Sequence, residues 1–97
     1  MCEKTFTPEY NLYEYLKDVA ENKKITRVRL TFAYQSVAHT SCLLLGKKNA
    51  IYDSHVGLFE YKKKHAFLLD LTEYCSRIRA LSTLNKKNVF VECFEHV

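Results

Sequence analysis

The sequence predicts a small α+β domain in which an antiparallel sheet carries two helices packed on one face. Two stretches show apolar residues at helical spacing, and four stretches have the pattern of β-strands. The predicted order of these elements is α-β-β-β-α-β. Each helix has one apolar stripe, and packing both helices on the same face of the sheet would bury both stripes.

The length and composition of the chain indicate one domain. Its 97 residues leave room for a single hydrophobic core, and 47% of them are apolar. The chain has one proline and two glycines, which argues against disorder or low complexity. We therefore expect a single domain over residues 1–97, with a core at about 8–84 and an added C-terminal strand at about 88–95.

The first helix is predicted from a start signal and an apolar stripe. Thr7, Pro8 and Glu9 match a helix N-terminus, with a threonine cap, a proline at the first position and an acid in the first turn. Apolar residues then recur on one side of the helix at Leu12, Leu16, Val19 and Ala20. Asn22 is expected to end the helix.

Three strands are expected between the helices, at residues 25–34, 40–46 and 50–61. In the first of them, apolar residues alternate with polar ones that include Arg27 and Arg29, so one face is buried and the other is exposed and basic. Residues 35–39 are expected to form a connection. Gly57 could bend or break the third strand.

The start of the second helix is open between two positions. An apolar stripe with spacings of four, three, four and three residues predicts a long helix that begins near Lys63, and its members are Phe67, Leu71, Tyr74, Ile78 and Leu81. Asp70 followed by Glu73 also matches a capping box, which would start the helix at Leu71. We favour the longer helix because the stripe runs through the whole segment without a phase break.

The chain closes with a β-rich segment, residues 88–95. Val89, Val91 and Cys93 fall on one face of this predicted strand, and Phe90, Phe94 and His96 fall on the other. We expect the strand to pair at a sheet edge or with a second copy of the chain.

Metal-binding and catalytic patterns find little support. His39 with Cys42, and Cys93 with His96, stand three residues apart, as zinc ligands often do. Cys42 and Cys93 both fall in predicted strands, where residues i and i+3 point to opposite faces, so we expect no metal site and no cofactor. The sequence has no phosphate loop and no nucleophile elbow, and Cys75 with a histidine is the nearest approach to a catalytic pair. We therefore expect no catalytic residues and no enzyme activity.

No segment resembles a signal peptide or a membrane span. The N-terminal residues are polar, and the longest apolar runs are residues 43–45 and 66–69. We expect an intracellular protein, cytoplasmic or nuclear, with no membrane partner. The four cysteines are then expected to be free thiols in a reducing compartment.

Positive charge gathers at the predicted ends of the helices and strands. The net charge of +4 does not by itself demand a nucleic-acid partner, so its clustering is more informative. The lysine clusters are Lys23-Lys24, Lys47-Lys48, Lys62-Lys63-Lys64 and Lys86-Lys87. If the second helix begins near Lys63, the third cluster would lie at a helix N-terminus, where a bound anion would meet both ammonium groups and free backbone N–H groups. The alternative is a solvated turn.

The α-β-β-β-α order, with Gly57 followed by Lys63, Lys64, His65 and Ala66, resembles a divergent double-stranded RNA-binding domain. Members of that family carry a Lys-Lys-x-Ala element at the start of the second helix, shortly after a glycine-containing turn. The resemblance covers roughly residues 8–84.

The resemblance implies three RNA contacts. Lys62, Lys63 and Lys64 would contact phosphates, and His39, in the connection between the first two strands, would reach into a minor groove. Asn11 and Tyr15, exposed on the first helix, would make the other minor-groove contact. Such a domain reads the shape of duplex RNA across two minor grooves and the phosphates between them.

The sequence therefore supports two functions. The first is a non-enzymatic binding module that recognises double-stranded RNA by shape and phosphate contacts. The alternative is a protein-interaction or dimerisation module, such as an accessory subunit or a small inhibitor, that uses exposed aromatic residues and the C-terminal strand.

Overall fold

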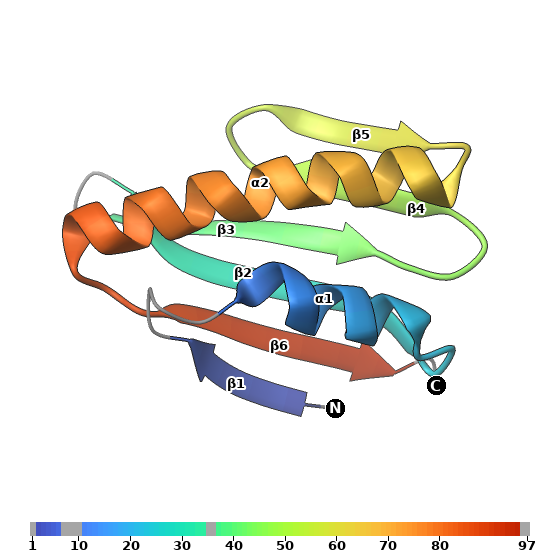
Figure 1. Cartoon of the computed structure of the whole chain (residues 1–97), viewed down its shortest axis with the longest axis horizontal. Coiled ribbons are helices and arrows are strands. Elements are labelled where there is room, and N and C mark those ends of the chain that lie inside the picture. The colour runs from blue at the N-terminus through green and yellow to red at the C-terminus, as the bar shows by residue number, and fades with distance from the viewer. Residues whose placement is uncertain (1, 7–10, 35–36, 96–97) are drawn as a thin grey trace.

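The computed structural model describes residues 2–6, 11–34 and 37–95, and it has the α+β fold that the sequence predicts (Figure 1). The strands are β1 (Cys2–Phe6), β2 (Ile25–Tyr34), β3 (Val37–Leu44), β4 (Asn49–Asp53), β5 (Gly57–Tyr61) and β6 (Val89–Glu95), and the helices are α1 (Leu12–Glu21) and α2 (Lys64–Asn85). These strands form one antiparallel sheet in the order β1-β6-β2-β3-β4-β5. Figure 1 shows both helices on the same face of the sheet.

The core lies between that face and the two helices. The predicted stripe of α2 is confirmed: Phe67, Leu71 and Ile78 are at most 1% exposed, and Tyr74 and Leu81 pack against the core at their sides. The stripe of α1 is confirmed as well, since its two leucines are buried and Val19 and Ala20 pack beside them. Burying each of these large side chains contributes about 1.5–3 kcal/mol, so the helix–sheet contact contributes substantially to stability.

α2 begins at Lys64, and this decides between the two predicted starts. Lys63 is the N-cap, with an extended backbone, and the N–H of Phe67 donates to its carbonyl oxygen at 3.2 Å. Asp70 lies inside the helix, where its carboxylate accepts a 2.7 Å hydrogen bond from the Tyr61 hydroxyl. The apolar stripe therefore prevailed over the local capping-box pattern.

α1 begins at Leu12, with Asn11 as its N-cap. The side-chain oxygen of Asn11 accepts a 3.2 Å hydrogen bond from the N–H of Glu14, which satisfies one of the free donors of the first turn. The predicted start at residues 7–9 lies outside the described residues. The helix ends before Asn22, as expected, although this cap has an extended backbone rather than a left-handed one.

The structure corrects two strand predictions and confirms that the third predicted strand is broken near Gly57. An additional strand, β1, pairs with β6 and was not predicted. The predicted third strand is a hairpin of β4 and β5, and Gly57 begins β5 with φ +113°, a conformation that glycine reaches at low cost. The predicted connection at residues 35–39 is wrong for Val37 to His39, which belong to β3.

β6 lies inside the sheet, between β1 and β2. The prediction that this C-terminal strand pairs at an edge or with a second copy is therefore wrong, because both of its backbone edges are occupied. The prediction for its two faces is confirmed. Val89, Val91 and Cys93 are buried on the helix side, and Phe90 is exposed on the other.

Candidate functional site

Three turns meet at one end of the sheet, on the right in Figure 1. They are the turns between α1 and β2, between β3 and β4, and between β5 and α2. The pairing places them side by side, and the N–H of Leu45 donates to the carbonyl of Thr26 at 2.9 Å, which ties the second turn to the start of β2. With the first residue of α2 they carry seven exposed lysines, Lys23, Lys24, Lys47, Lys48, Lys62, Lys63 and Lys64. We call this surface the lysine end.

The N-terminus of α2 opens onto the lysine end without a capping side chain. The side chain of Lys63 makes no cap hydrogen bond, and the first turn of the helix contains no acid. The first N–H groups of a helix have no partner within it, and the helix dipole adds positive potential there. Lysines in this place cost some stability, and a phosphate would meet both the ammonium groups and the N–H groups. Glu21 and Glu95 end their elements at the same end of the sheet, but the lysines outnumber them.

The lysine end contains more than the sequence analysis assigned to a site. Lys62, Lys63 and Lys64 were predicted to contact phosphates, and all three are exposed there. The four lysines of the other two turns form clusters in the sequence, but they were not predicted to belong to the same site as Lys62, Lys63 and Lys64. The sequence indicates that these lysines lie at the ends of helices and strands. Only the strand order shows that these ends are neighbours.

His39 lies within β3 and is buried, so the prediction that it stands in a connection is wrong. Its side chain is about 6% exposed, and its Nε2 lies 3.0 Å from Oδ2 of Asp53. Its ring also stacks in parallel on the ring of His55, with 4.5 Å between the centroids. A minor-groove contact requires an exposed side chain, and this burial disfavours that role.

Asp53 is the centre of a hydrogen-bond network that joins β3, β4 and α2. The Tyr74 hydroxyl donates to its Oδ2 at 2.6 Å, and the backbone N–H of His55 donates to its Oδ1 at 2.8 Å. Burial by itself would raise the pKa of Asp53, but the hydrogen bonds from Tyr74, His39 and His55 outweigh it and hold that pKa below its usual value. Asp53 is the last residue of β4, at the end of the sheet away from the lysine end. The network therefore has a structural role in the core.

Asn11 is exposed, as predicted, but Tyr15 is not. Asn11 caps the end of α1 that lies away from the lysine end (Figure 1). Tyr15 is half-buried, its ring centroid is 4.9 Å from that of Phe6, and burial raises its pKa. Lys4 also places its Nζ 5.1 Å from the ring centroid of Tyr15. Strand β1 supplies both contacts. Because β1 was not predicted, the sequence pattern of α1 suggested that the Tyr15 side chain is exposed.

The predicted zinc-like pairs do not come together. His39 and Cys42 lie on opposite faces of the sheet, and His96 is outside the described residues. Within residues 2–6, 11–34 and 37–95, no three or more His, Cys, Asp or Glu side chains form a group that could hold a metal ion. Cys93 is disulfide-bonded, so the expectation of a free thiol is wrong at that position.

Cys42 and Cys75 are free cysteines. Cys75 faces the core, and burial raises the pKa of its thiol to about 12. At neutral pH it is therefore a thiol rather than a reactive thiolate, as expected of a small core residue.

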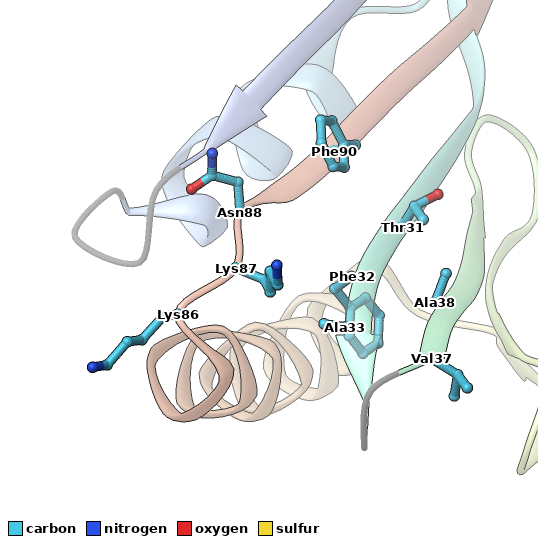
Figure 2. Close-up of a pocket in the computed structure, with 9 residues that line it drawn as sticks. All are labelled: Thr31, Phe32, Ala33, Val37, Ala38, Lys86, Lys87, Asn88 and Phe90. Atoms are coloured by element: carbon cyan, nitrogen blue, oxygen red, sulfur yellow. The ribbon is translucent and has the colours of Figure 1, made fainter.

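A hollow of about 670 Å³ opens at the end of the sheet opposite the lysine end (Figure 2). It forms where β2 continues beyond its last pair with β6, Thr31 opposite Phe90. Its walls are mainly apolar, and Lys86, Lys87 and Asn88 line one side. In Figure 2, Lys86 points away from the other lining side chains. This end therefore offers an anion much less positive charge than the lysine end does.

No protein-family model, curated protein or solved structure matches this chain. The resemblance to double-stranded RNA-binding domains therefore stays a prediction. Among the helices described, none is both long enough and apolar enough to cross a membrane. The fold and the lysine end define an α+β domain with one strongly basic end, and the functional proposal rests on that geometry.

Proposed function

We propose that this protein is a non-enzymatic module that binds the phosphate backbone of double-stranded RNA through its lysine end. The observation that supports the proposal most is the gathering of seven exposed lysines, six from three turns and one from the first residue of α2, around the uncapped N-terminus of that helix. Phosphate contacts supply most of the affinity in nucleic-acid binding, and they require positive groups rather than a deep pocket.

The dimensions of the lysine end suit a duplex. Its three turns span the four neighbouring strands from β2 to β5, a width of about 14 Å at the usual strand spacing. A nucleic-acid duplex carries one charge per ~1.7 Å of its axis, so a length of about 14 Å carries about eight phosphates, of which only about half lie on the side that faces the protein. The seven lysines are more than enough to place at least one ammonium group near each of those phosphates.

The structure changes which residues this proposal uses. Of the contacts implied by the resemblance, the proposal keeps Lys62, Lys63 and Lys64 and adds the lysines of the other two turns. It assigns no RNA contact to His39, which is buried, or to Asn11 and Tyr15, which have structural contacts. Binding should therefore depend strongly on charge and weakly on base sequence.

The test is a titration of the protein with duplex RNA, duplex DNA and single-stranded RNA of one sequence, at two salt concentrations. The double variant Lys63→Glu/Lys64→Glu reverses two charges at the lysine end, and Lys86→Glu/Lys87→Glu makes the same change at the opposite end. We expect tightest binding to duplex RNA, and a loss of at least about tenfold, or about 1.4 kcal/mol, in the first variant only. Equal affinity for the three nucleic acids, or equal losses in the two variants, would contradict the proposal.

A further inference from the structure

The face of the sheet that carries no helix is open and partly apolar. Along β2, Val28 and Leu30 are buried beneath the helices, so Arg29 between them points to the other face. The strand register continues that row from Arg29 to Cys42, Tyr52 and Leu58. Leu44 lies in the adjacent row. We call Cys42, Leu44, Tyr52 and Leu58 the apolar patch.

The apolar patch is exposed to a degree that is unusual for large side chains. Leu44, Tyr52 and Leu58 are 37%, 45% and 51% exposed, and they are contiguous across β3, β4 and β5. On the same face, Phe90 of β6 is 52% exposed. A contiguous apolar surface bordered by polar residues is typical of a protein–protein interface.

The charges on this face favour a protein partner over a nucleic acid. The register places Arg27 and Arg29 there together with three glutamates, Glu3, Glu60 and Glu92. Arg29 and Glu92 already form a double hydrogen bond, at 2.9 and 2.8 Å. The face is thus close to neutral with both signs present, although the whole chain has a net charge of +4. Such a surface does not repel a copy of itself and does not attract phosphates.

The size of the face also fits a pair of chains. The molecule measures 35 by 25 Å along its two longer axes, and Figure 1 looks along the third onto the broad side of the sheet. A face of these dimensions has an area of the order of the ~800 Å² that each partner buries in a standard interface.

We propose that a second copy of this chain packs on the helix-free face, so that two sheets form a β-sandwich with a helix layer on each outer side. A two-fold axis that runs across the strands would place the apolar patch on its own copy and the two lysine ends far apart. An axis along the strands would instead lay the patch on the charged residues of β2 and β6 and bring both lysine ends together. Burial of apolar surface and charge repulsion therefore favour the first arrangement. This dimer is independent of RNA binding.

The first test measures the mass of the protein in solution by sedimentation or light scattering. We expect twice the chain mass of 11.4 kDa for the wild type. Tyr52→Lys/Leu58→Lys should give the mass of one chain. The matched control Leu69→Lys/Leu84→Lys, at α2 positions that are 58% and 79% exposed, should remain a dimer. A single-chain mass for the wild type at concentrations up to about 1 mM would overturn the proposal, because even a millimolar Kd gives measurable dimer there.

The second test needs no variant. Cys42 is a half-buried free thiol on the helix-free face, and Cys75 is a buried one in the core. The rate at which Cys42 reacts with a maleimide should fall severalfold as the protein concentration is raised through the dimer Kd. Peptide mass spectrometry separates its product from that of Cys75. A rate that does not change with concentration would contradict a second copy on this face.

Discussion

Nε2 of His39 lies 3.0 Å from Oδ2 of Asp53, and both residues are buried, at 6% and 7% exposure. This contact joins β3 to the end of β4, and Tyr74 extends it to α2. A buried carboxylate is costly unless donors surround it, so the network should contribute to stability through the completeness of its hydrogen bonds.

The Tyr74 hydroxyl provides the first test of this network. Tyr74→Phe should lower the free energy of unfolding by about 1.5–3 kcal/mol, because it removes a hydrogen bond to a buried carboxylate. Tyr61→Phe removes the same group from an exposed bond to Asp70 and should cost less than about 1 kcal/mol. Urea denaturation of both variants makes the comparison, and equal losses would show that burial does not strengthen the Asp53 bond.

The lowered pKa of Asp53 predicts a pH dependence. Because that pKa is lower in the folded protein than the ordinary ~3.9, the charged carboxylate contributes stability that is present above about pH 4 and is lost as the pH falls through the folded value. Asp53→Asn lacks this contribution at every pH. The difference between wild type and Asp53→Asn should therefore be largest near neutral pH and shrink below about pH 4 in urea denaturation. A difference that stays constant would contradict the lowered pKa.

The uncapped N-terminus of α2 predicts that an N-cap acceptor at position 63 would stabilise the protein. Lys63→Asp supplies an N-cap acceptor and should raise the free energy of unfolding by about 1 kcal/mol. Lys62→Asp makes the same charge change outside the cap position and should stabilise the protein less. Thermal unfolding compares the two variants. A Lys63→Asp protein no more stable than Lys62→Asp would argue against a helix start at Lys64.

The β4–β5 hairpin depends on the backbone conformation of Gly57. Gly57→Ala should cost about 1–3 kcal/mol, because φ is +113° at this position. A methyl group there would meet no atom within 4 Å, so the cost would come from backbone strain alone. Ser54→Ala, in the exposed turn before it, is the control and should cost much less in urea denaturation. A Gly57→Ala protein as stable as wild type would refute the strain.

What could be predicted from the sequence was mostly local. The apolar stripe from Phe67 to Leu81 was enough to predict α2 and to favour the longer of its two possible starts, because helical periodicity depends on nearby residues. β1 escaped prediction because its five residues form a strand only by pairing with β6, at the other end of the chain. The exposure of Tyr15 was misjudged for the same reason, since Phe6 of β1 packs against it.

The candidate site shows the same division. The lysine clusters could be read from the sequence, but their meeting at one end depends on the strand order. The burial of His39 depends on Asp53 and Tyr74, which are 14 and 35 positions away, and no local pattern connects them. Contacts between distant residues therefore decided which of the predicted contact residues the proposal keeps.

The salt dependence of duplex-RNA binding tests the central proposal most directly. Each phosphate contact that a protein makes adds about one unit to the slope of log affinity against log salt concentration. Lys63→Glu/Lys64→Glu should therefore lower the slope by about two units, and Lys86→Glu/Lys87→Glu should leave the wild-type slope unchanged. If the two variants instead lower the slope equally, or neither lowers it, the lysine end is not where this protein binds RNA.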